Sequence, residues 1–152
     1  MNNSNYVYNN EALGAITIAA VLRYINQMSY AKALLILPFL MHLNTVSFLK
    51  NSATKVRSVE ELIAKKPQFF ANFNRRYESL IPISINSIFI LKEMRVIEIS
   101  KGKLNYLADN HLDLDNSLLG KRVENIIKAS EKLSKLLEED ASNLYLQLRI
   151  EL

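Results

Sequence analysis

The stretch ALLILPFLMHL, residues 33–43, contains no charged residue and has a proline near its centre. Such a run can cross a membrane, fill a protein core or cover the apolar surface of a partner. A spanning helix needs about 20 consecutive apolar residues, whereas this run begins after Lys32 and fades into His42 and Asn44. Pro38 also removes one amide donor from a helix. The run therefore predicts core or partner surface.

The chain as a whole has the composition of a soluble protein with one core. It contains 152 residues, of which 49% are hydrophobic, and this length suits a single domain. No basic start of a signal peptide precedes the apolar residues 12–22, so we expect a cytoplasmic chain without membrane contact. Within the single domain 1–152 we distinguish three parts, which are apolar N-terminal helices (1–57), a winged-helix-like part (58–107), and a long helix with a terminal strand (117–152).

Cysteine and charge restrict the chemistry that this chain can perform. The sequence has no cysteine, which excludes disulfides, thiolate zinc sites and cysteine nucleophiles. The net charge of +4 is uneven, because residues 1–57 carry +4, residues 58–107 carry +3 and residues 108–152 carry −3. The basic and acidic parts are therefore expected to face different partners.

Two apolar helices are expected in the N-terminal part, after an extended segment over residues 1–9. Asn10 is a suitable N-cap and Glu11 suits the positive end of the helix dipole, so the first helix should begin there and be mostly buried. Residues 30–49 predict one helix that breaks or kinks near Pro38, since the residue before a proline is pushed towards extended geometry.

The middle part predicts a winged helix. Ser58 and Glu61 have the spacing of a capping box for a short helix that ends near Lys66, and Pro67 suits the first turn of a second helix over residues 67–81. After Pro82 the chain is expected to restart.

A third helix, over residues 85–95, would be capped by Ser84. The period then changes to two on either side of Lys101 and Gly102, as in a β-hairpin. Three helices followed by a hairpin wing are typical of a winged helix.

The C-terminal part combines an acidic loop, a long amphipathic helix over residues 117–140 and a terminal strand. Apolar residues alternate along the strand and should share one face; they are Leu144, Leu146, Leu148, Ile150 and Leu152. The expected fold class is thus mainly α, a helical domain with a winged-helix-like core, a short β-hairpin wing, a long C-terminal helix and a candidate terminal β-strand.

Catalytic and metal-binding patterns find little support. Asp113, Asp115, Ser117 and Glu124 follow the spacing of a calcium loop, but the position that needs glycine is Leu118. His42 and His111 are far apart in sequence, and no serine or threonine has the context of a nucleophile. We therefore expect no enzyme activity, no catalytic or metal-binding residues and no cofactor.

Cations of the predicted third helix and wing are candidates for DNA binding. They are Lys92, Arg95, Lys101 and Lys103. Such side chains can contact phosphates, but Glu93 and Glu98 interrupt the patch, and the helix is unusually apolar for a DNA groove. The pattern therefore favours contact with a protein over contact with DNA.

The segments YNNEALGAITIAAVLRYI and LLILPFLMHLNTVSFL resemble the middle component of bacterial ABC-three-component conflict systems, a set that overlaps the small subunit of Lamassu-type antiphage defence. Matching positions are Tyr8, Asn9, Ala12, Tyr24, Leu37, Pro38 and His42. The resemblance is best over the first fifty residues. It departs from the family pattern where Asn-Pro is replaced by Asn-Asn-Glu and where the tail reads LQLRIEL.

This resemblance implies a non-catalytic adaptor that joins an SMC- or Rad50-like ATPase to an effector such as a nuclease, with DNA reached through the complex. Partner contacts are then expected from the matching residues Tyr8, Asn9, Tyr24, Leu37, Pro38 and His42 and from Leu146 and Leu148 of the terminal strand. The alternative from another class is a winged-helix transcriptional regulator that binds DNA as a homodimer. A neighbouring gene for a large coiled-coil ATPase would favour the adaptor.

Overall fold

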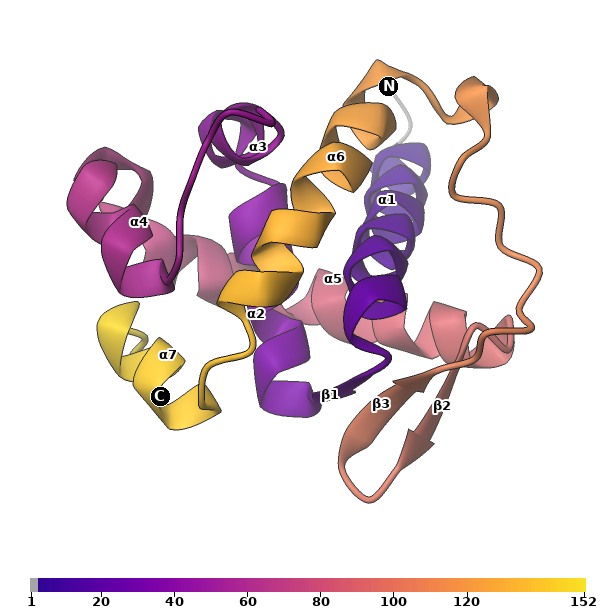
Figure 1. Cartoon of the computed structure of the whole chain (residues 1–152). Helices are drawn as coiled ribbons and strands as arrows, with labels where there is room; N and C mark the ends of the chain where they lie inside the picture. The colour runs from indigo at the N-terminus through magenta and orange to yellow at the C-terminus, as the bar shows by residue number, and fades with distance from the viewer. Residues whose placement is uncertain (1–2) are drawn as a thin grey trace.

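The computed structural model describes the backbone of residues 3–152 and the side chains of residues 10–152. Over this range the chain is mainly helical and carries one small antiparallel sheet, which confirms the expected fold class (Figure 1). The α-helices are α1 (Asn3–Ile25), α2 (Tyr30–Leu40), α3 (Leu43–Leu49), α4 (Val59–Lys65), α5 (Phe73–Glu93), α6 (Lys121–Leu136) and α7 (Ala141–Gln147). The strands are β1 (Gln27–Ser29), β2 (Ile97–Ser100) and β3 (Lys103–Tyr106), and two 3₁₀ helices are η1 (Pro67–Phe70) and η2 (Ser117–Leu119).

Helix α1 lies at the centre of the core, packed against α2, α5 and α6 (Figure 1). Its residues 18–22 are completely buried, as expected for a mostly buried helix. The helix begins at Asn3. The expected N-cap at Asn10 and the extended segment before it are therefore wrong for the described residues, because the helix continues through this polar stretch.

The apolar run 33–43 lies mostly in the core: every side chain from Leu35 to Leu40 is buried, whereas Leu43 at its end is 67% exposed. The expected break is present but lies after Pro38, at Met41 and His42, where α3 turns away from α2 by 95°. Pro38 itself stays inside α2. Over the described residues no single helix is long and apolar enough to cross a membrane, and only α2 and α3 taken together as a bent pair reach that length and composition.

Helix α4 begins as its capping-box spacing predicts. Ser58 Oγ accepts a hydrogen bond from the Glu61 N–H at 3.0 Å, and Glu61 reaches back to the Arg57 N–H at 2.8 Å. The helix ends at Lys65, which confirms the expected short helix. The bounds 67–81 expected for the second helix are wrong, because Pro67 starts only the 3₁₀ turn η1 and α5 begins at Phe73. The capping contacts of α4 lie within a few residues of one another, so the local sequence can specify them.

Helix α5 continues through Pro82, so the separate third helix predicted over residues 85–95 is wrong. Ser84, the expected cap, is completely buried in the middle of α5. A proline inside a helix costs about 3 kcal/mol, and packing of α5 against α1 and α2 offsets that cost. Pro82 lies on the exposed face of the helix.

The hairpin of β2 and β3 is confirmed, with its turn at Lys101 and Gly102. It projects from the helical body near the end of α5 (Figure 1). The sheet also contains β1, which was not expected and pairs with β3, so that the strand order is β1-β3-β2. A three-residue strand is too short to give a period in the sequence, and β3 supplies its hydrogen bonds from about 75 residues away.

The prediction of a terminal strand is wrong, because residues 141–147 form helix α7. Asp140 Oδ1 accepts from the Ser142 N–H at 2.9 Å and caps this helix. A sequence with an apolar residue at every second position also has apolar pairs four residues apart, which lie on one face of a helix. Leu144 and Leu148 are such a pair, and both are buried. Helix α6 is amphipathic as expected but shorter, running from Lys121 to Leu136.

Candidate interaction surfaces

The residues that match the middle-component pattern do not form one surface. Tyr8 and Asn9 lie outside the residues whose side chains are described. Leu37 is completely buried and Pro38 is buried in α2, so both belong to the core. Tyr24 is 42% exposed near the end of α1. Among the matching positions whose side chains are described, Tyr24 and Ala12 are exposed, and His42 is partly buried.

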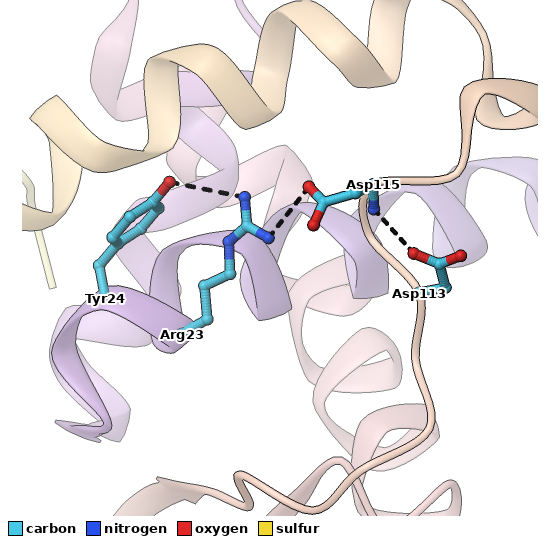
Figure 2. Close-up of polar contacts among 4 residues, drawn as sticks. All are labelled: Arg23, Tyr24, Asp113 and Asp115. Atoms are coloured by element: carbon cyan, nitrogen blue, oxygen red, sulfur yellow. Dashed lines mark hydrogen bonds and ion pairs between the residues drawn. The ribbon is translucent and has the colours of Figure 1, made fainter.

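Arg23, next to Tyr24, connects the end of α1 to the acidic loop before α6, as Figure 2 shows. Its guanidinium donates to Asp115 Oδ1 at 3.4 Å and to Tyr24 Oη at 3.5 Å. Asp113 Oδ1 accepts from the Asp115 N–H at 3.1 Å, which closes the loop locally. Two carboxylates of the calcium-like spacing are therefore occupied in holding this loop.

The described side chains, those of residues 10–152, do not form a metal-binding site. No group of three or more histidine, aspartate or glutamate side chains is placed so that it could hold an ion. The Asp113 and Asp115 contacts are those of a loop that packs on α1 (Figure 2).

His42 lies at the break between α2 and α3, partly buried. Its Nδ1 is 2.8 Å from Thr45 Oγ1, and its ring packs edge-on against Phe69 with centroids 5.7 Å apart. Burial, with a smaller contribution from the nearby Arg76 charge, lowers the pKa of His42 below the ordinary value of 6.5. The folded chain therefore favours neutral His42.

Acidification is expected to destabilise the fold partly through His42. Below about pH 6.5 the unfolded chain takes up a proton on this residue before the folded chain does, so the free energy of unfolding falls as pH drops through the folded pKa. Denaturant unfolding of the natural chain and of His42→Gln at pH 7.5 and 5.5 tests this. The natural chain should lose more stability than the variant, and equal losses would contradict it.

An apolar groove of about 630 Å³ lies where α7 meets α2 and α5. Leu34, Tyr145, Leu146 and Ile150 line it, and Leu146 is 76% exposed. The C-terminal Leu152, fully exposed, lies at its edge. We call this feature the C-terminal groove.

Tyr145 fixes one wall of the C-terminal groove. Its hydroxyl donates to the Ala31 carbonyl at 2.6 Å and lies 3.1 Å from the Tyr77 hydroxyl. Burial, followed by the contact with Tyr77, raises the pKa of Tyr145 well above its usual range. The groove is thus built on a fixed tyrosine pair and not on a loose tail.

The helical conformation of α7 places the two leucines that were expected to bind a partner on different sides. Leu146 faces the C-terminal groove, whereas Leu148 is 3% exposed and packs into the core. A strand would have placed both on one face, but a helix turns residues two apart by about 200°. The groove residues Ala31, Leu34 and Tyr77 were missed because they come from two other elements, with no local pattern linking them to α7.

The four cations proposed for DNA contact are exposed and lie at the two ends of β2. Lys92 and Arg95 are at the end of α5, and Lys101 and Lys103 are at the tip of the hairpin. Four residues of extended strand separate the pairs by about 13 Å. The structure therefore gives two pairs of cations and not one patch.

The outer face of α5 carries exposed apolar residues, within the segment 85–95 that the sequence showed to be unusually apolar. Ile85 and Phe89 are 41% and 53% exposed, and residues 79–91 contain no charge. Their spacing of four places them on one side of the helix. This uncharged face differs from the polar surface that a DNA groove requires.

Comparison with known proteins places the chain in one family. The model described as ABC-three component (ABC-3C) system Middle Component 3 matches residues 2–152. No curated protein and no solved structure matches.

Proposed function

Since the chain belongs to the Middle Component 3 family of ABC-three component systems, we propose that it is the non-catalytic adaptor of an antiphage complex of the Lamassu type. In this proposal it binds an SMC- or Rad50-like ATPase subunit and links it to an effector such as a nuclease. DNA would be reached mainly through the assembled complex.

The observation that carries this proposal is the C-terminal groove. Soluble monomers rarely leave clustered apolar side chains in contact with water, and such clusters commonly mark protein interfaces. Leu146 and Leu152 are exposed beside the apolar wall formed by Leu34 and Ile150. An apolar segment of the ATPase subunit would bury these side chains, and their removal from water would stabilise the complex.

Replacing Leu146 with glutamate tests the groove. The charge would have to be buried on binding, which costs several kcal/mol, so co-purification with the ATPase encoded beside the chain should fall at least tenfold. Leu146 is exposed in the free chain, so helical circular dichroism and the melting temperature should stay nearly unchanged. Leu148 is unsuitable for this purpose, because a charge there would disrupt the core.

Leu118→Glu is the matched control. Leu118 is 89% exposed and lies in η2. The segment before α6 lies at the opposite end of α6 from α7 (Figure 1). This variant should bind the ATPase as the natural chain does. Equal binding by Leu146→Glu and the natural chain would contradict the groove, and a natural chain with no affinity for the adjacent ATPase would contradict the adaptor role.

The second candidate function, a winged-helix DNA-binding regulator, is favoured by the topology of the sheet. A helix, β1 and further helices precede the hairpin, and the strand order is β1-β3-β2, which supports a wing-like role of the hairpin in this proposal. In this comparison α5 would enter the DNA groove, yet its exposed residues Ile85 and Phe89 are apolar. We therefore rank the regulator below the adaptor.

A further inference from the structure

We propose that the groove between the exposed face of α6, the end of α3 and the end of α1 binds the phosphate backbone of a single-stranded nucleic acid. Its cations are Lys50, Lys128, Lys132 and Lys135. We call it the lysine groove. This inference goes beyond the adaptor role and uses none of the residues of the C-terminal groove.

The lysine groove is a concave surface with a volume of about 650 Å³. Helix α6 packs between α1 and α3, so residues from all three helices meet there (Figure 1). Lys128, Lys132 and Lys135 follow one another at spacings of four and three, which places them on one face of α6 over about 10 Å. Lys50 faces them from the end of α3.

The charge of the lysine groove favours an anion. Four lysines and one acidic residue, Glu131, contribute to its lining. Lys128 is paired with Glu124 at 2.9 Å and Lys135 with Glu131 at 3.4 Å, but all four side chains are more than half exposed. Exposed ion pairs contribute little to stability. Both lysines can therefore turn towards a phosphate at small cost.

The remaining two lysines are positioned by neutral partners. Lys50 Nζ donates to Asn125 Oδ1 at 3.4 Å, and Lys132 Nζ donates to the Asn51 carbonyl. Neither contact removes the positive charge, which stays available to a ligand. Both bonds join α6 to the chain at the end of α3.

Tyr24 supplies an aromatic wall to the lysine groove. Tyr24 is 42% exposed, and the Arg23 guanidinium lies 5.2 Å from its ring centroid. Proteins that bind single strands without sequence preference combine a basic groove with aromatic side chains on which bases stack. A tyrosine beside a line of lysines matches this combination, and it favours a single strand over a duplex.

The cations of the hairpin lack this arrangement. They are interrupted by Glu93 and Glu98 and divided between the two ends of β2. The lysine groove was not apparent in the sequence, because Lys50 and α6 are about 80 residues apart and the C-terminal part is acidic overall.

The test is fluorescence anisotropy of a labelled 20-nucleotide single-stranded DNA with the 152-residue chain. Binding should weaken about fiftyfold between 50 and 200 mM salt, as expected if about four phosphates of a single strand are neutralised. Changing all four lysines of the lysine groove to glutamine should weaken binding at 50 mM salt at least tenfold. Tyr24→Leu should weaken single-strand binding several-fold and duplex binding much less.

A charge-matched control changes Lys92, Arg95, Lys101 and Lys103 to glutamine and should alter affinity by less than twofold. If the fourfold groove variant fails to fold, the double variant Lys128→Gln with Lys135→Gln keeps the test valid, because both side chains are exposed. Unchanged affinity in the folded groove variant, an equal loss in the hairpin variant, or no binding by the natural chain would overturn the proposal. Leu146→Glu should not affect this assay, so failure here is distinguishable from failure of the adaptor role.

Discussion

Replacing Arg76 with alanine is expected to lower the free energy of unfolding by about 3 kcal/mol. Arg76 Nε donates to the Pro38 carbonyl at 3.3 Å, and a terminal nitrogen donates to the Phe69 carbonyl at 2.8 Å. Helix α2 ends at Leu40, so the carbonyls of its last turn need partners from outside the helix. One guanidinium thus satisfies the end of α2 and the end of η1 together.

Two further features make this arginine difficult to replace. Its guanidinium lies 5.2 Å from the Phe73 ring centroid, and burial lowers the pKa of Arg76 from its usual value. Lysine has no planar fork with which to reach two carbonyls in different directions. Arg76→Lys should therefore recover less than half of the lost stability.

Thermal and denaturant unfolding measure this effect, and a loss of about 3 kcal/mol corresponds to roughly 10 °C in the melting temperature. Arg75→Ala is the matched control, because Arg75 is an exposed arginine on the adjacent position of α5. It should change stability by less than about 0.5 kcal/mol. Similar losses for the two variants would contradict the special role of Arg76.

Replacing Gly14 with leucine should be comparably damaging, lowering stability by about 3 kcal/mol or more. A Cβ atom at this position would lie 2.3 Å from Ser87 Oγ and 3.3 Å from Leu37 Cδ1. Gly14 is buried where α1 crosses α5, so the added side chain has no free space. Ser87 Oγ also donates to the Glu11 carbonyl at 3.1 Å, a bond that its displacement would break.

Ala12→Leu provides the control for Gly14→Leu, because Ala12 is exposed on the same helix. The control should leave the melting temperature nearly unchanged, since leucine and alanine are both good helix formers. Combining Gly14→Ala with Ser87→Gly should be less destabilising than Gly14→Leu, because the smaller pair restores space. A natural melting temperature for Gly14→Leu would show that α1 and α5 do not approach this closely in solution.

Part of the candidate interaction surface could be predicted from the sequence, and part depended on how the chain folds. The apolar character of residues 85–95 was visible in the sequence, and the structure shows that Ile85 and Phe89 are exposed. Leu146 was identified as a partner-binding candidate and is exposed beside a groove. The other half of that groove, from α2 and α5, and the lysine groove could not be predicted, since both combine residues distant in sequence.

The sequence by itself determined those features that depend on neighbours within a few residues. The capping box of α4, the hairpin turn at Lys101 and Gly102 and the amphipathic pattern of α6 all belong to this class. The apolar run 33–43 could likewise be assigned to core or interface, because its length and Pro38 argue against a membrane span.

Only the tertiary structure decided the continuation of α5 through Pro82, the pairing of β1 with β3, and the helical state of residues 141–147. In each case the local pattern allowed two conformations that differ by a few kcal/mol. Burial of apolar α5 side chains on both sides of Pro82, hydrogen bonds from β3, and burial of Leu144 with Leu148 then selected one of them. Long-range contacts outweigh local preference here because they remove more apolar surface from water than the alternative conformations would.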